Sequence, residues 1–175
     1  MEVALLALGK EISAELDALS LSTGESRRIV RLELARYATH ALMMPYGDFL
    51  AAAQLVRYDI DVLRSRFNVS FEQATSRLTT LARPGAAGLP WFVHVRARPC
   101  RQRHSQGGRA RISEGAFGGQ CPKLGIHSAF AQPGQVLAEA VEMPDGNTFL
   151  TVSRTVEAPQ AAFEERLRRI AILLG

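Results

Sequence analysis

Hydrophobic residues in the first part of the chain recur at the spacing of an α-helix. Ile12, Leu16 and Leu19 lie four and three residues apart, which predicts a helix over residues 2–19. A second helix is expected to follow and to end near Met44, because the proline after it cannot continue a helix. The opening pattern therefore predicts a helical first half.

Three shorter helices are expected between this point and the middle of the chain. They cover residues 48–56, 59–66 and 70–81. A capping box, in which a hydroxyl residue precedes Glu or Gln by three positions, marks two of the predicted helix starts. The pairs are Ser22 with Glu25 and Ser70 with Gln73.

The hydrophobic period changes in the second half. Residues 83–90 are rich in proline and glycine and are predicted to form a linker. Trp91, Val93 and Val95 then alternate with the residues between them, which is the spacing of a β-strand. A Pro-Asp-Gly-Asn turn further along the chain predicts a hairpin.

The strands of that hairpin are expected over residues 135–142 and 148–156, and a basic helix over residues 159–174 is expected to close the chain. The fold class is therefore predicted as α+β. A helical region of residues 1–82 precedes the linker, and residues 91–175 form a small antiparallel sheet with a C-terminal helix.

Charge and cysteine content narrow the class of protein. The net charge is +4, and six arginines fall within residues 96–111, where no acidic residue occurs. Such a cluster can bind phosphates of nucleic acid or of a nucleotide-like ligand, and a solvated loop is the plainer alternative. No apolar run is long enough to span a bilayer, and two cysteines are too few for a disulfide scaffold, which favours a cytoplasmic protein.

A helical pair over residues 61–81 has the helix, tight turn and second helix of a DNA-binding motif. With the arginine cluster it supports an alternative function, direct DNA binding. The start of the second helix, Phe71-Glu72-Gln73, carries little positive charge, which argues against base or phosphate contact.

Metal-dependent hydrolysis is not expected, so the chain is predicted not to be an enzyme. A zinc peptidase needs two histidines one helical turn apart with a glutamate beside the first, and no pair among the four histidines has this spacing. His40 is interpreted as a packed helix residue. Cys121, in the segment F-G-G-Q-C-P, could serve as one thiolate ligand of an iron–sulfur cluster, which normally needs four.

The segment M-M-P-Y-G-D-F-L-A-A-A begins a helix with two aromatic residues, Tyr46 and Phe49. A tyrosine at a helix start can stack on a base or donate to a phosphate, and a packed helix entrance is equally consistent with the pattern. Arg57 and Tyr58 follow and could share the same surface.

Together, M-M-P-Y-x-x-F-L-A-A-A and F-G-G-x-C-P resemble the short-chain fatty acyl transcriptional regulators, a family of RamB-, PrpR- and MccR-like proteins. The first half also resembles an IrrE/ImmA-type metallopeptidase region that has lost its metal ligands. The resemblance implies an acyl-coenzyme A effector and control of acetate or propionate metabolism. It further implies contact with DNA through a helix-turn-helix domain that is absent from this chain.

From this resemblance, ligand contact is expected at Tyr46, Phe49 and Arg57, with Phe130 as a candidate pocket wall. An iron–sulfur cluster is implied for full-length relatives only, because their cysteine-rich motif lies beyond the last residue here, and no cofactor is assigned to this chain alone. A homodimer built on the apolar helical half is a further expectation, and no membrane contact is expected.

Residues 98–116 depart from the family pattern, which suggests the hypothesis of a compensated local frameshift. On that hypothesis the arginine cluster and Cys100 have no selected function, and the sheet lacks a strand. Resequencing, or the gene of a close relative, would show two single-base insertions or deletions around this stretch.

Overall fold

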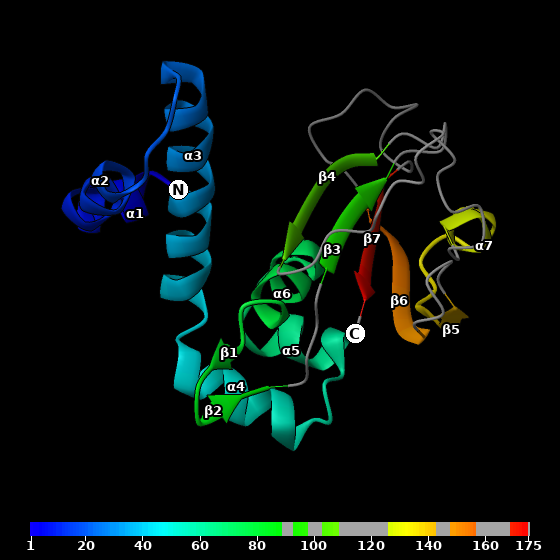
Figure 1. Ribbon diagram of the computed structural model, residues 1–175. Coiled ribbons are helices and arrows are strands. Elements are labelled where there is room, and N and C mark those ends of the chain that lie inside the picture. Colours follow the sequence, from blue (N-terminus) through cyan, green and yellow to red (C-terminus); the bar gives the residue numbers. More distant parts are fainter. Residues whose placement is uncertain (89–92, 98–102, 109–125, 143–147, 157–168, 175) are drawn as a thin grey trace.

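A computed structural model describes residues 1–88, 93–97, 103–108, 126–142, 148–156 and 169–174 (Figure 1). The helices are α1 (Glu2–Ala7), α2 (Gly9–Ala18), α3 (Gly24–Met43), α4 (Tyr46–Leu55), α5 (Ile60–Arg66), α6 (Phe71–Leu78) and α7 (Ile126–Ala131). The strands are β1 (Ala82–Arg83), β2 (Ala86–Ala87), β3 (Val93–Ala97), β4 (Arg103–Gly108), β5 (Leu137–Glu142), β6 (Thr148–Val156) and β7 (Arg169–Leu174). A helical N-terminal part is thus followed by antiparallel sheets.

The first two expected helices differ from the sequence prediction. The first expected helix is divided into α1 and α2, because Leu8 leaves the helical conformation at φ −124° and ψ 21°. The N-cap of α3 is Thr23, whose hydroxyl accepts a hydrogen bond from the backbone N–H of Ser26 at 3.0 Å. The predicted cap at Ser22 is therefore wrong by one residue.

The second predicted capping box is confirmed. The hydroxyl of Ser70 accepts the backbone N–H of Gln73 at 3.1 Å, and the Gln73 side chain accepts the backbone N–H of Ser70 at 2.8 Å. These two bonds satisfy donors that the first turn of a helix otherwise leaves free. They fix the start of α6 and with it the direction of the turn from α5.

Two hydrophobic clusters hold the helices. The N-terminal cluster joins α1, α2 and α3 through Ala4, Ile12, Leu16, Ala35 and Ala38. The larger cluster lies between α4, α5 and α6 and includes Phe49, Leu63 and Leu78, and Val152 of β6 packs into it. The sheet is thereby attached to the helical part on the side of α5 and α6. None of the described helices is long and apolar enough to cross a bilayer.

The five-stranded sheet has the order β4-β3-β7-β6-β5, and every neighbouring pair is antiparallel. The predicted hairpin of β5 and β6 is confirmed, with Leu137 opposite Ser153 and Glu142 opposite Thr148. Helix α7 contacts β6 and β7. Figure 1 shows β7 in the middle of the sheet, between β3 and β6.

The expected C-terminal helix is wrong for residues 169–174, which form the central strand β7. Ile172 pairs with Val95 of β3 on one side and with Ser153 of β6 on the other. The edges of β3 and β6 supply hydrogen-bond partners along the whole length of this short apolar run, R-I-A-I-L-L. These bonds outweigh the tendency of the run to form a helix. The rest of the predicted helix lies outside the described residues.

The structure adds two elements to the predicted ones. Within the arginine-rich stretch, residues 103–108 form β4 and pair with β3, at a place where the frameshift hypothesis implies a missing strand. The expected linker contains a two-stranded hairpin, in which Ala82 pairs with Ala87 and Arg83 with Ala86. We refer to residues 82–87 below as the β1–β2 hairpin.

Candidate functional site

Tyr46 joins the start of α4 to the β1–β2 hairpin. The helix begins directly after Pro45, and the Tyr46 side chain is buried. Its hydroxyl donates a hydrogen bond to the Ala86 carbonyl at 2.8 Å and accepts one from the Arg83 backbone N–H at 2.9 Å. Because both bonds reach the hairpin, Tyr46 holds it against the helix entrance.

Two arginine side chains lie against the Tyr46 ring. The guanidinium carbon of Arg83 is 4.1 Å from the ring centroid, and that of Arg77 is 5.8 Å from it. Both distances are within the range of a cation–π contact. Arg83 is exposed, whereas Arg77 is only 2% exposed. The tyrosine ring therefore contacts one buried cation and a second cation that solvent or a ligand can reach.

Arg77 is a buried positive charge held by neutral groups. Its Nε donates to the Met44 carbonyl at 3.0 Å and one terminal nitrogen donates to the Thr80 hydroxyl at 3.1 Å. Tyr37 of α3 gives a second cation–π contact at 5.8 Å. Within the part of the chain that the structure describes, no carboxylate forms an ion pair with Arg77. Arg77 thus fixes the α3–α4 turn to α6.

Phe49 lies one turn after Tyr46 and is fully buried. Its ring meets Phe67 edge to face, with centroids 5.1 Å apart. This contact belongs to the cluster between α4 and α5, where the two rings form a rigid aromatic pair. A ligand that reaches Phe49 must enter that cluster.

Arg57 and Tyr58 form the turn between α4 and α5. Both have left-handed backbone conformations, with φ of 52° and 61°, and Arg57 is exposed. The Tyr58 hydroxyl lies near the end of the β1–β2 hairpin, since it is 3.3 Å from the position a Cβ would take on Gly88. The structure therefore brings Tyr46 and Tyr58 to the same hairpin.

The side chains of two expected site residues are not among those that the structure describes. Phe130 lies on α7, whose backbone is described while the Phe130 side chain is not, and Cys121 lies outside the described residues. Sequence reasoning also missed two residues, Arg77 and Arg83. Nothing in the local pattern marks them, because each meets Tyr46 from more than thirty residues along the chain.

An open cavity of about 330 Å³ lies between α4 and the end of α5. Ala51, Ala52, Leu55 and Phe67 give it apolar walls, and Asp48 and Arg66 contribute the charged groups. A second cavity of about 270 Å³ is lined by Met1, Arg36, Thr39, His40, Glu72 and Gln73. His40 itself is buried. Among the described residues, no group of three or more metal-binding side chains could hold an ion.

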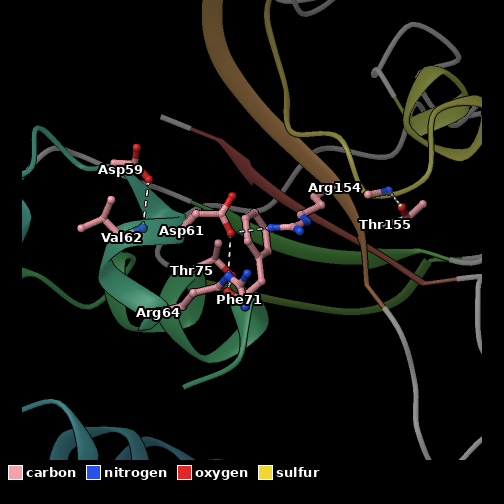
Figure 2. A network of polar contacts seen from close by, with 9 residues as sticks. Asp59, Asp61, Val62, Arg64, Phe71, Thr75, Arg154 and Thr155 are labelled. Carbon is pink, nitrogen blue, oxygen red and sulfur yellow. Dashed lines mark hydrogen bonds and ion pairs between the residues drawn. The ribbon is translucent and has the colours of Figure 1, made fainter. Parts of the chain in front are cut away.

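Asp61 joins the helices to the sheet (Figure 2). One of its carboxylate oxygens accepts hydrogen bonds from Arg64 of α5 and Arg154 of β6, both at 2.5 Å. Burial raises the pKa of the Asp61 carboxyl, but the hydrogen bonds and charges of the two arginines lower it more, so the pKa lies below its ordinary value. Arg154 also covers the Phe71 ring at 5.5 Å, at the start of α6.

The helical pair α5–α6 exists as expected, but the face of α6 that would contact DNA is buried within the protein. Phe71, Ala74 and Thr75 near the start of α6 are buried, the first of them beneath Arg154. A recognition helix instead exposes its first turns to the major groove. The geometry of α6 therefore does not favour direct DNA contact.

Comparison with known families divides the chain in two. Residues 80–175 match the family described as short-chain fatty acyl coenzyme A regulator, C-terminal, and residues 1–79 match the IrrE N-terminal-like domain of a peptidase family. The chain is 40% identical over 176 residues to a propionyl-CoA carboxylase regulator of Cereibacter sphaeroides. It is 38% identical to the transcriptional regulator RamB and 37% identical to PrpR, both of Mycobacterium tuberculosis.

These relatives are longer proteins. The matched region is 99% of this chain but 38% of the propionyl-CoA carboxylase regulator and 36% of RamB. A solved structure, a transcriptional regulator of Mycobacterium tuberculosis, superposes with a TM-score of 0.85 at 31% identity. That match covers 99% of this chain and 53% of the solved one. The fold described above is thus shared with a regulator.

Proposed function

The chain belongs to the short-chain fatty acyl coenzyme A regulators, and from this premise we propose that it is the effector-sensing part of a transcriptional regulator that binds an acyl-coenzyme A. The homologous proteins are regulators, and the peptidase-like region of residues 1–79 contributes structure to the sensor and no hydrolysis. Contact with DNA belongs to another part of the regulator. The protein acts inside the cell.

One observation carries this proposal, the cationic and aromatic surface around the β1–β2 hairpin. Arg83 presents an exposed guanidinium stacked on Tyr46, and Arg57 presents a second exposed cation in the turn that leads to Tyr58. Coenzyme A carries phosphates and an adenine ring. Guanidinium groups bind phosphate oxygens in pairs of hydrogen bonds and stack on flat rings, so this surface suits that end of the ligand.

The proposed roles follow from burial. Arg57 binds a phosphate, and Tyr46 holds the hairpin and Arg83 in position for the adenine end. Phe49 and Phe130 form walls for the acyl chain, which requires an apolar site. The apolar cavity beside α4, lined by Ala51, Ala52 and Phe67, lies next to the Phe49–Phe67 pair and supports an acyl site on this helix.

The regulated metabolism is proposed from the same relatives. A propionyl-CoA carboxylase regulator is among them, so we assign this chain to control of short-chain fatty acid use, with acetyl- or propionyl-coenzyme A as the effector. The response would pass from the ligand to the DNA-binding part of the regulator.

Calorimetric titration tests the proposal. The purified chain is titrated with acetyl-, propionyl- and butyryl-coenzyme A, and with free coenzyme A and propionate as controls. We expect saturable binding that depends on both the acyl group and the coenzyme. Arg57→Gln should weaken binding about tenfold or more, because it removes a charge-assisted phosphate contact. Arg31→Gln, an exposed arginine on α3, is the matched control and should leave affinity unchanged.

A folded chain that binds none of the thioesters would overturn the effector proposal. Equal binding of free coenzyme A and propionyl-coenzyme A would support the proposed phosphate contacts but contradict the proposed acyl site. The direct DNA-binding alternative is measured in the same preparation with duplex DNA at two salt concentrations, where steeply salt-dependent binding would favour it.

A further inference from the structure

The second cavity, of about 270 Å³, lies between the C-terminal half of α3 and the start of α6. Its lining residues are Met1, Arg36, Thr39, His40, Glu72 and Gln73. At about 100° per residue, the three from α3 fall within an arc of about 100° on one face of that helix. Figure 1 shows the N-terminus beside α3. None of these residues belongs to the surface around the β1–β2 hairpin, so the cavity is a separate site.

The cavity presents one charge of each sign. Arg36 comes from α3, and its side chain is 40% exposed. Glu72 comes from the first turn of α6 and is half-buried, so its carboxylate is partly removed from water. Partial burial strengthens the attraction between a charged group and an opposite charge. A ligand that suits both walls therefore carries a negative and a positive group.

The two neutral polar residues of the lining are bound within the protein. The Thr39 hydroxyl donates to the Ala35 carbonyl at 2.7 Å. The Gln73 side chain accepts the backbone N–H of Ser70 at 2.8 Å, and its amide nitrogen lies 3.9 Å from the Met43 sulfur. Thr39 and Gln73 thus shape the cavity, whereas the charged groups select its ligand.

Several contacts fix α3 and α6 relative to each other around the cavity. The capping box of α6 holds the first turn, in which Glu72 lies. Arg77 of α6 donates to the carbonyl of Met44, at the end of α3, at 3.0 Å. Groups that are positioned before a ligand arrives lose less conformational entropy when it binds. The two opposite charges are therefore held ready for a ligand between them.

The cavity fits a small molecule. Its volume equals that of about nine water molecules in the liquid, at about 30 Å³ each, which is far less than a coenzyme needs. Apolar side chains lie at its edge, since Met1 lines it and Met43 contacts Gln73. A carboxylate, an ammonium group and a short apolar side chain together make up an aliphatic α-amino acid.

We propose that this cavity binds a free aliphatic α-amino acid of about the size of valine. Arg36 binds the carboxylate, and Glu72 accepts hydrogen bonds from the ammonium group. Arg36 already donates to Glu33 at 2.6 Å, but a guanidinium has several N–H donors and can hold a second carboxylate. A carboxylate likewise accepts several hydrogen bonds, so Glu72 binds the ammonium group in addition to its contacts within the protein.

Because the chain belongs to a family of regulators, the amino acid acts as a second effector. The regulator then responds to the supply of amino acids as well as to its other ligand. This inference does not depend on the acyl-coenzyme A site, because the two sites share no residue.

NMR titration of the 175-residue chain with valine and leucine tests the proposal. Isovalerate is valine without its ammonium group, and isobutylamine is valine without its carboxylate. Each should bind at least about tenfold more weakly than valine, because it leaves one charge of the cavity without a partner. Propionyl-coenzyme A, titrated separately, distinguishes this site from the effector site.

Two variants assign the roles of the charges. Arg36→Gln and Glu72→Gln should each weaken valine binding at least about tenfold. Glu72→Gln should also strengthen isovalerate binding relative to the natural chain, because it removes a like charge from beside the carboxylate, and a purely structural role would not have this effect. Both variants should bind propionyl-coenzyme A as the natural chain does.

Arg31→Gln is the matched control, since Arg31 is exposed on α3 about 140° away from Arg36, and it should leave valine binding unchanged. Circular dichroism verifies that each variant is folded. A folded natural chain that binds neither valine nor leucine at about 10 mM overturns the proposal. Equal affinity for valine and isovalerate, or full valine binding by Glu72→Gln, also overturns it.

Discussion

Single side chains join parts of this chain that are distant in sequence. The Tyr46 hydroxyl uses its donor and its acceptor on the hairpin 37 and 40 residues away. Arg77 reaches back 33 residues to a backbone carbonyl in the α3–α4 turn. Each such hydrogen bond replaces hydrogen bonds to water, so its net contribution to the free energy of unfolding is modest. Its loss costs more, because a buried partner is then left without a hydrogen bond.

Tyr46→Phe should lower the free energy of unfolding by about 1–2 kcal/mol, because it keeps the ring and removes both hydrogen bonds to the hairpin. Urea unfolding followed by circular dichroism measures the change. Tyr37→Phe is the control, since Tyr37 is exposed and its ring contact with Arg77 needs no hydroxyl. Equal losses in the two variants would contradict the role given to the Tyr46 hydroxyl.

Arg77→Lys should destabilise the chain by about 1–3 kcal/mol, because an ammonium cannot serve the Met44 carbonyl, the Thr80 hydroxyl and two rings at once. Arg83→Lys should cost much less, since Arg83 is exposed and its backbone makes the bond to Tyr46. Thermal unfolding of the two variants gives the comparison. A larger loss for Arg83→Lys would refute the assignment.

The sequence predicts the site only in part, for a physical reason. The pattern M-P-Y-x-x-F places Tyr46 and Phe49 at a helix entrance, and the structure agrees on that placement. Local spacing cannot reveal Arg77 and Arg83, because their contacts with Tyr46 form only when α6 and the hairpin fold back. Long-range contacts of this kind leave no periodic trace in a single sequence.

Among the elements, helix α6 and the β5–β6 hairpin follow their local signals, whereas the cap of α3 and strand β7 do not. Ser70 and Gln73 cap α6 as their spacing predicts, because both bonds lie within one turn. The misassigned cap of α3 shows the limit, since Ser22 and Thr23 are both hydroxyl residues and only the backbone geometry selects Thr23. Strand β7 needs partners on both sides, so its six residues alone do not determine its structure.

The capping assignment of α3 can be tested by a pair of substitutions. Thr23→Ala should lower the free energy of unfolding by about 1 kcal/mol, because the backbone N–H of Ser26 loses its acceptor. Ser22→Ala should change it by less than about 0.5 kcal/mol, as expected of an exposed residue outside such features. Chemical denaturation distinguishes the two. The reverse order of effects would restore the cap at Ser22.

At the scale of the whole molecule, the Asp61 ion pairs tie α5 to the sheet. Because the pKa of Asp61 is lowered in the folded state, its stabilising effect is fully present above the ordinary aspartate value near 3.8. The effect is lost as the pH falls through the lower folded-state pKa. Solvent screens this partly exposed carboxylate, so the contribution is about 1 kcal/mol or less.

Asp61→Asn should therefore destabilise the chain at neutral pH and reduce the loss of stability on acidification. Unfolding midpoints measured from neutral pH down to about pH 3 give both quantities. Glu15→Gln, an exposed carboxylate on α2, is the control and should leave the acid profile unchanged. An unaltered profile in Asp61→Asn would contradict the contribution assigned to these ion pairs.

The position of β7 also has a consequence during synthesis on the ribosome. The hairpins β3–β4 and β5–β6 precede β7 in the chain, yet their inner strands meet only through it. A nascent chain therefore presents two open strand edges until β7 leaves the exit tunnel, and at about 5–20 residues per second that interval lasts seconds. Open strand edges can pair with strands of other chains. We therefore expect this protein to aggregate, and to bind holdase chaperones, most readily while it is being synthesised on polysomes.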